Sequence, residues 1–321
     1  MKIKQKIIVI LGQTSTGKSD FAVEIARQVG GEIISADSRQ VYKGMDLGTG
    51  KITKKEMKGV PHHLLDIVSP AKKIFSVSDF QKLANKKIEE ILKKGKIPII
   101  CGGTGFYIDS VVNGNVFPEV PPNKKLRKEL YSKSAIALFE YLKKIDPRRA
   151  KNIDQNNKVR LIRAIEIAKA LGKVPPIKTT NKDKFATFSA PAENVASNQT
   201  NFEVLKIGLA FPPEILKERI YNRLLARIKI GMIKEIKNLH EKEKVSWKKL
   251  NSFGLEYRHV ALFLQGKLKK EEMIEKLNSQ IWHFAKRQKT WFKRDPNIIW
   301  INPLKKTEKN KALLAVKKFL K

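Results

Sequence analysis

The chain has 321 residues, a hydrophobic content of 41% and a formal net charge of +35, from 66 lysines and arginines against 31 acids. This length accommodates one large or two ordinary domains, and no apolar run is long enough to span a bilayer. The single cysteine, Cys101, excludes an internal disulfide and a zinc site built from several cysteines, so we expect a cytoplasmic protein with no membrane partner.

The first predicted element is a buried strand over KIIVIL, residues 6–11. The N-terminus is basic and then apolar, as in a signal sequence, but it lacks a small-residue cleavage site and runs straight into a glycine loop. That loop, GQTSTGKS at 12–19, fits the pattern G-x-x-x-x-G-K-[ST], and apolar residues at helical spacing follow it. Strand, glycine loop and helix are the context that a phosphate-binding loop (P-loop) requires.

The loop is suited to hold an anion. Its backbone N–H groups can point inward, and the N-terminus of the following helix adds partial positive charge. Lys18 would reach the outer phosphate, and the Ser19 hydroxyl would hold Mg²⁺. A glycine turn that binds nothing is the alternative, which this context disfavours. The predicted phosphate-binding residues are Gly12, Gln13, Thr14, Ser15, Thr16, Gly17, Lys18 and Ser19.

The next elements alternate between strand and helix. The apolar strand EIISADS ends at Asp37, a helix runs from about Val77 to Lys94, and KIPIICGGTGFY combines a strand, a glycine turn and a helix start. This alternation predicts an α/β fold with a doubly wound parallel sheet, whose ligands lie at the carboxyl ends of the strands. The loops at 12–19, 37–40 and 102–105 are therefore candidates for one site.

The usual hydrolytic apparatus of an NTPase is not evident. An NTPase commonly ends a nearby apolar strand in an aspartate that holds Mg²⁺, whereas the strand PIIC ends in Gly102, Gly103 and Thr104. This favours a bound phosphate or diphosphate over NTP hydrolysis. Asp66, in LLDI, remains an alternative partner for the metal.

A proline break, PEVPPNKK, starts a different region. Residues after it are helical and strongly basic, and we predict an inserted helical subdomain at 118–202, whose polar segment 177–201 would form a flexible loop. The catalytic core would comprise 1–117 and 203–321. In its second part, VLKIGLAF and NIIWIN are predicted strands, and mostly basic amphipathic helix lies between them.

The excess positive charge lies mainly beyond the first 120 residues. Residues 1–120 hold 19 basic and 12 acidic residues, so the remaining 201 residues carry a net +28. A polyanion partner, most simply nucleic acid, would explain this excess. A general lysine-rich composition is the alternative.

Seven blocks of the sequence resemble, in order and spacing, those of bacterial tRNA dimethylallyltransferases, the tRNA isopentenyltransferase family. They are GQTSTGKS, DSRQVYKGMDLGTGK, HHLLDI, FSVSDF, IPIICGGTGFYI, VRLIRAIEIAKALGKVP and AKRQKTWFKRD. The resemblance covers roughly residues 6–300. It implies transfer of a dimethylallyl group from dimethylallyl diphosphate to N6 of adenine 37 in tRNA, with release of diphosphate. The P-loop, although of the ATP-binding type, would then hold the prenyl diphosphate with Mg²⁺.

The resemblance implies catalytic roles for three residues. Asp37 would accept the proton of the adenine amine as it attacks the prenyl carbon. Arg223 would reach the diphosphate, and Thr104 would bond a diphosphate oxygen or orient the amine. A helix cap or an outer ligand of magnesium remains the alternative for Asp37, and a helix cap the alternative for Thr104.

Contacts with tRNA are also implied. A base flipped out of the anticodon loop would meet Thr104 and the segment Asp37, Ser38, Arg39 and Gln40, where the Gln40 amide can bond an adenine edge. On the inserted subdomain the matching positions are Arg127, Val159, Arg160, Leu161, Ile162 and Arg163. The chain departs from the family at Val159, where glutamine is usual, at Leu225 and Arg227, and in GLEYR, which leaves the register of residues 251–258 open. The Lys and Arg of AKRQKTW are open between a tRNA contact and a solvated helix face.

Two other classes of protein remain open. An adenylate isopentenyltransferase would share the catalytic core, but the basic inserted subdomain and basic C-terminal part argue against it. A P-loop kinase or a nucleic-acid-binding ATPase is disfavoured because a strand-end aspartate and an arginine finger are missing. The expected partners are tRNA and dimethylallyl diphosphate, and the expected state is a monomer.

Overall fold

The computed structural model describes residues 5–71, 74–176 and 202–321. The chain divides into two compact units, a large one made of 1–114 and 198–321 and a small one made of 115–197. The sequence placed the inserted subdomain at 118–202. The flexible loop predicted for 177–201 lies outside the described residues.

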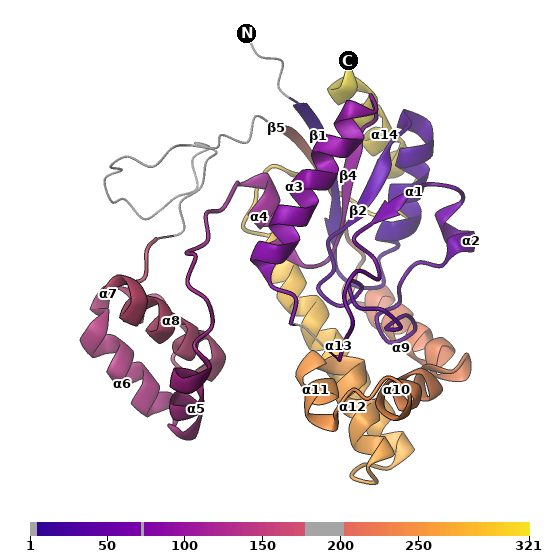
Figure 1. Ribbon diagram of the computed structural model, residues 1–321. Coiled ribbons are helices and arrows are strands. Elements are labelled where there is room, and N and C mark those ends of the chain that lie inside the picture. The colour runs from indigo at the N-terminus through magenta and orange to yellow at the C-terminus, as the bar shows by residue number, and fades with distance from the viewer. Residues whose placement is uncertain (1–4, 72–73, 177–201) are drawn as a thin grey trace. The chain divides into compact units, whose positions relative to one another are not determined.

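Among the described residues of the large unit, six parallel strands form one sheet, whose arrangement Figure 1 shows. In spatial order they are β3 (His62–His63), β2 (Glu32–Ser35), β4 (Pro98–Gly102), β1 (Gln5–Gly12), β5 (Phe202–Leu209) and β6 (Ile298–Ile301). In the central pairings, Ile8 lies opposite Ile99 on one side and Leu205 on the other. Isoleucine and valine dominate β1 because a central parallel strand is buried on both faces. The predicted all-parallel α/β sheet is confirmed.

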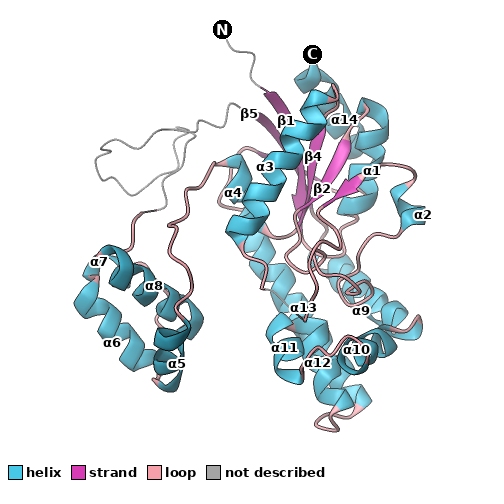
Figure 2. Cartoon of the chain, viewed as in Figure 1, coloured by secondary structure: helices cyan, strands magenta, loops and turns pink. Residues whose placement is uncertain are grey.

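Helices cover both faces of the sheet, as a doubly wound fold requires (Figures 1 and 2). On one face, Ile8 and Ile10 pack with α1 (Lys18–Val29) and α14 (Lys306–Leu320). On the other, Ile7 and Val9 belong to the core that includes α3 (Val77–Lys93) and α4 (Gly105–Val112). Alternation along β1 thus divides the hydrophobic core into two layers.

A group of helices lies beyond the carboxyl ends of the strands (Figure 1). They are α9 (Pro213–Lys229), α10 (Met232–Glu241), α11 (Trp247–Phe253), α12 (Leu255–Leu264) and α13 (Lys270–Phe292). The long helix α13 contacts β1, α4, α9 and α12. The one-turn helix α2 (Lys54–Met57) lies between β2 and β3 in sequence. Within the described ranges, no helix combines the length and apolarity needed to cross a bilayer.

The small unit is helical, with α5 (Lys124–Ser132), α6 (Ala135–Ile145), α7 (Pro147–Ala150) and α8 (Lys158–Leu171). A polar side chain caps the N-terminus of each helix by accepting a backbone N–H: Asn123, Ser134, Asp146 and Asn157. Its own core includes Leu130, Leu138, Leu142, Leu161 and Ile165. The small unit therefore has its own hydrophobic core and its own capped helices.

Candidate active site

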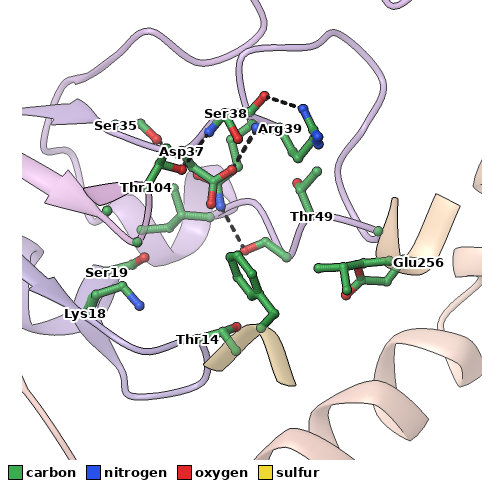
Figure 3. A pocket seen from close by; sticks show the side chains of 18 of the residues that line it. Thr14, Lys18, Ser19, Ser35, Asp37, Ser38, Arg39, Thr49, Thr104 and Glu256 are labelled. Carbon is green, nitrogen blue, oxygen red and sulfur yellow. Dashed lines mark hydrogen bonds between the residues drawn. The ribbon is translucent and has the colours of Figure 1, made fainter. Parts of the chain in front are cut away.

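A cavity of about 430 Å³ opens at the carboxyl ends of β1, β2 and β4. Parallel strands end at the same edge of a sheet, so the loops that follow them meet there. The three loops singled out from the sequence all contribute to the lining, with residues from α9, α12 and α13 opposite them. In Figure 3, Asp37, Ser38 and Thr104 lie together above Lys18 and Ser19, while Thr49 and Glu256 lie to one side.

The P-loop presents three of its eight residues to this cavity: Thr14, Lys18 and Ser19. The Gln13 and Thr16 side chains are buried instead. Gln13 Nε2 donates to the carbonyl of Ala285 at 3.0 Å, and Thr16 Oγ1 donates to the carbonyl of Gln13 at 2.8 Å. These two side chains stabilise the loop, so at their positions only the backbone is left to meet an anion.

Lys18 is the cation of this loop. Its Nζ donates to the carbonyl of Gln13 at 2.5 Å. Burial in the cavity wall lowers the pKa of Lys18 to about 8, because removing an ammonium from water disfavours its charged form. A bound anion would favour that charged form further. Ser19, at the start of α1, is exposed and lines the same cavity.

The Asp37 carboxylate is held through one oxygen. Its Oδ1 accepts the backbone N–H groups of Arg39 at 2.8 Å and Gln40 at 3.3 Å. In the part of the chain that the structure describes, no hydrogen bond involves Oδ2. The residues after Asp37 form a turn, so the structure does not support the helix-cap alternative. The turn orients a carboxylate that keeps one oxygen available in the cavity.

Thr104 precedes α4, yet its side chain makes no capping bond to that helix. Its Oγ1 accepts the backbone N–H of Ser38 at 3.1 Å, and its own N–H donates to the carbonyl of Ala36 at 3.2 Å. The capping alternative is therefore wrong. Thr104 joins the loop after β4 to the loop of Asp37, and its hydroxyl proton stays available for a ligand.

Side chains from distant elements complete the wall. Arg223, on α9, lines the cavity, and its Nη2 donates to the carbonyl of Gly50 at 3.0 Å. Gln40 Nε2 approaches the same carbonyl at 3.5 Å, and Arg39 Nε donates to the carbonyl of Phe253 at 2.9 Å. The cavity thus contains cationic side chains that can bind an anion. It also contains an amide and a carboxylate that can bind a nucleobase.

The predicted contact residues of the small unit differ in their exposure. Val159 and Arg160 are exposed and Arg163 is half-buried, whereas Leu161 and Ile162 are buried in the core of the unit. Leu161 and Ile162 are therefore not accessible to tRNA, contrary to the prediction. They lie on the inward face of an amphipathic helix, which a partner does not reach.

Arg127 is engaged within the small unit. Its Nε and Nη2 donate to the two carboxylate oxygens of Glu166 at 2.7 and 2.8 Å. Glu166 is almost fully buried, and it also accepts the N–H of Asn123. This bidentate pair joins α5 to α8, and it uses two of the five N–H donors of the guanidinium.

The cavity can supply oxygen ligands to a magnesium ion. The described residues contain no group of three or more His, Cys, Asp or Glu side chains placed to hold a metal. Asp66, the alternative partner, is paired with Lys51 at 2.5 Å. Mg²⁺ often takes one or two protein oxygens and completes its shell with substrate phosphates and water. The Ser19 hydroxyl, together with diphosphate oxygens, therefore fits a magnesium–diphosphate better than a bare ion.

Comparison with known proteins identifies the family. The sequence profile of the IPP transferases matches residues 40–295. The chain belongs to the IPP transferase family. Among its members, tRNA dimethylallyltransferase 2 of Treponema denticola is 46% identical over 93% of this chain and 95% of its own length. The tRNA dimethylallyltransferase 1 of Geotalea uraniireducens is 40% identical over 97% and 98%.

Solved structures of the family agree with this assignment. A tRNA isopentenylpyrophosphate transferase from Bacillus halodurans superposes with a TM-score of 0.69 at 34% identity, covering 99% of this chain and 96% of its own. A eukaryotic dimethylallyltransferase acting on tRNA gives a TM-score of 0.75 at 26% identity, covering 97% and 78%. The family's fold therefore extends over both units of the chain.

Gln288, which lies in the family block AKRQKTWFKRD, was not among the predicted site residues. Its side chain is 6% exposed and forms part of the cavity wall. Gln288 Oε1 accepts the N–H of Thr14 at 2.8 Å, and Nε2 donates to the carbonyl of Gly103 at 2.9 Å. A Cβ at Gly103 would lie 2.2 Å from Nε2, so any larger residue there would displace the Gln288 amide from this position. The signal was a polar residue on the apolar face of a helix.

Proposed function

We propose that this protein transfers a dimethylallyl group from dimethylallyl diphosphate to N6 of adenine 37 in tRNA and releases diphosphate. One observation supports this most: a carboxylate with a free oxygen, Asp37, shares a cavity with the anion-binding side chains Lys18, Ser19 and Arg223. Base and anion site are thus adjacent, as a transfer from a diphosphate to an amine requires. The names of the family relatives, tRNA dimethylallyltransferases, support the same reaction.

On the acceptor side, Asp37 acts as the general base. Oδ1 keeps its two backbone bonds, while Oδ2 takes a proton from the N6 amine as the nitrogen attacks C1 of the prenyl group. The N6–C1 bond forms, the C1–oxygen bond breaks, and its electron pair leaves with the diphosphate. The Thr104 hydroxyl donates to a diphosphate oxygen or orients the amine, and the Gln40 amide meets the adenine edge.

On the donor side, positive charge receives the leaving group. Lys18, Arg223 and the backbone amides of the P-loop stabilise the negative charge that develops on the diphosphate. Mg²⁺, held by Ser19 and the diphosphate, would neutralise part of that charge when bound. Two donors of the loop are already engaged, because the Thr14 N–H is bound to Gln288 and Lys18 donates to Gln13. Lys18 exchanges its carbonyl partner for the ligand.

The flanks of the tRNA would contact exposed residues beyond the cavity. Arg160 and Arg163, with Val159, form the accessible part of the predicted segment on α8, and Arg127 retains donors beyond its pair with Glu166. Ser38 and Arg39 would meet the flipped base. We also propose that the protein acts in the cytoplasm as a monomer.

A ligand comparison tests this function. Thermal unfolding is measured with Mg²⁺ and either dimethylallyl diphosphate or ATP, and transfer is then measured to unmodified tRNA or to AMP. We expect stabilisation by dimethylallyl diphosphate and transfer to tRNA alone. Stabilisation by ATP with ATP hydrolysis would indicate an ATPase instead, and transfer to AMP would indicate an adenylate prenyltransferase.

A further inference from the structure

The loop at residues 46–50 forms one wall of the cavity but has no regular secondary structure. Gly48, Thr49 and Gly50 line the cavity. The chain here is a succession of turns between β2 and α2. A loop of this kind keeps a fixed shape only if its backbone groups find partners outside it. These partners come from α9 and α10.

Glu235, on α10, binds three consecutive backbone N–H groups of this loop. Its Oε2 accepts from Asp46 at 3.1 Å and from Leu47 at 2.6 Å, and its Oε1 accepts from Gly48 at 3.0 Å. The Tyr257 hydroxyl donates to Oε1 at 3.2 Å. Four donors satisfy the two carboxylate oxygens, and bonds to an ionised acceptor are roughly twice as strong as neutral ones.

Arg227, on α9, binds the carbonyl side of the same loop. Its Nη1 donates to the carbonyls of Leu47 at 3.2 Å and Gly48 at 3.0 Å. Its Nη2 donates to Glu256 Oε1 at 2.8 Å, and both side chains of this pair are largely buried. The Glu235 carboxylate thus binds the N–H groups of this short segment, and the Arg227 guanidinium binds its C=O groups.

The held segment leads directly to Gly50, whose carbonyl joins the two halves of the site. It accepts Arg223 Nη2, from the diphosphate side, at 3.0 Å and lies 3.5 Å from Gln40 Nε2, on the adenine side. Gly50 has φ +60°, and a Cβ there would lie 2.3 Å from Arg223 Nη2. The position of this one carbonyl therefore affects the groups for both substrates.

We propose that Glu235 is a positioning residue that fixes the 46–50 loop and, through the Gly50 carbonyl, orients Arg223 and Gln40. The inference rests on the proposed function for the roles of these two residues. Glu235 itself does not line the cavity, so it acts only through the loop. Small misplacements of binding groups are costly, since a shift of about 1 Å can lower a rate by roughly 100-fold.

The test combines Glu235→Gln with Arg223→Lys. Glutamine keeps the size of the side chain but turns an NH₂ group toward N–H donors, so the loop loses part of its anchor. Glu241→Gln, an exposed residue on the same helix, is the matched control. Binding of inorganic diphosphate with Mg²⁺ is measured by calorimetry, and prenyl transfer to tRNA is measured alongside.

We expect Glu235→Gln to weaken diphosphate binding and to lower kcat/KM for transfer by roughly 10- to 100-fold, with Glu241→Gln unchanged. We further expect Arg223→Lys to cost much less in the Glu235→Gln background than in the wild type, because Arg223 is then already misplaced. If the fold losses in kcat/KM from Glu235→Gln and Arg223→Lys simply multiply in the double variant, the proposal is overturned. A general loss of stability would give that result.

Gly50→Ala keeps the proposal testable if Glu235→Gln does not fold. It disturbs the same carbonyl without touching α10, and it should likewise reduce the penalty of Arg223→Lys. If Arg223→Lys costs as much in the Gly50→Ala background as in the wild type, the inference is overturned. A wild type that binds diphosphate and shows the predicted coupling, but transfers no prenyl group, would contradict the proposed function alone.

Discussion

Asp37 combines a fixed orientation with a free carboxylate oxygen, and this makes its basicity testable. Asp37→Asn keeps an oxygen for the Arg39 and Gln40 N–H groups but loses the ability to take a proton. We expect turnover to fall by about 10²–10⁴-fold, the usual worth of a general base, with tRNA affinity little changed. Single-turnover transfer assays and tRNA binding by anisotropy measure the two quantities.

Asp66→Asn is the control for that variant. Asp66 is half-exposed, and its partner Lys51 is buried but also bonds Asp46 at 2.5 Å and the carbonyl of Tyr42 at 3.1 Å. Lys51 therefore keeps two other acceptors when Asp66 loses its charge. The replacement of Asp66 should leave transfer nearly unchanged. Near-normal turnover in Asp37→Asn would remove Asp37 from the mechanism, and a large loss in Asp66→Asn would return the metal role to that residue.

Lys18 gives the site a pH dependence. Burial holds the pKa of Lys18 at about 8, below the ordinary 10.5, so in the free enzyme its charge is present below that pH and lost above it. We expect kcat/KM for dimethylallyl diphosphate to fall above pH 8, by up to roughly tenfold per pH unit. Turnover at saturation should change less, because a bound diphosphate favours the ammonium.

A pH series from 6.5 to 9.5 at saturating tRNA measures this profile. Lys18→Arg is the informative variant, because a guanidinium stays charged over the whole range. It should lose the decline at high pH even where its activity is lower. A wild-type profile that is flat to pH 9.5 would show that Lys18 does not control diphosphate binding.

Helix α13 connects two of the catalytic loops, and Gln288 makes both connections. Gln288→Met keeps the bulk of the side chain but removes the bonds to Thr14 and Gly103, so the P-loop and the turn before Thr104 lose their shared anchor. We expect kcat/KM to fall by roughly 10- to 100-fold. The exposed Gln280, on the same helix, supplies the control Gln280→Ala. Equal activity of both variants would show that the loops hold their positions without Gln288.

The start of α8 is the element on which the proposed tRNA contact depends. Replacing Arg160 and Arg163 with Ala should weaken tRNA binding and reduce the log–log salt slope by about 0.7 to 0.9 for each phosphate that the variant no longer binds. Diphosphate affinity should stay the same. Lys143→Ala with Lys144→Ala, two exposed lysines of α6, removes the same charge from another surface of the small unit.

Anisotropy across a salt series compares the two double variants with the wild type. Equal affinity and slope for the wild type and the arginine variant would mean that α8 does not bind tRNA. Equal losses in the arginine and lysine variants would indicate a general charge effect. The net +28 beyond residue 120 would then be better interpreted as a solvated surface.

Local sequence patterns predicted the parallel sheet and the loops at its edge. A β-branched run before a glycine loop, and helical spacing after it, mark β1 and α1 without any tertiary information. Asp37 and Thr104 follow β2 and β4, and because parallel strands end together they meet in one cavity. The family resemblance supplied Arg223, which lies far away in sequence.

What the sequence did not predict comes from tertiary contacts. Gln288 and Glu235 hold loops that lie far from them along the chain, through hydrogen bonds to backbone groups, and no side-chain pattern in the loops reveals such partners. The error at Leu161 and Ile162 has another cause. Residues were carried over as a continuous segment, although consecutive residues of a helix point to different faces.

We propose that the P-loop of this protein holds a prenyl diphosphate for transfer to a tRNA base. The decisive assay incubates the protein with dimethylallyl diphosphate, Mg²⁺ and unmodified tRNA that contains A37, and then analyses the digested nucleosides by mass spectrometry. We expect N6-dimethylallyl adenosine at position 37, none in a tRNA with guanosine there, and no appreciable ATP hydrolysis. Robust ATP hydrolysis with unmodified adenosine at position 37 would contradict the proposal.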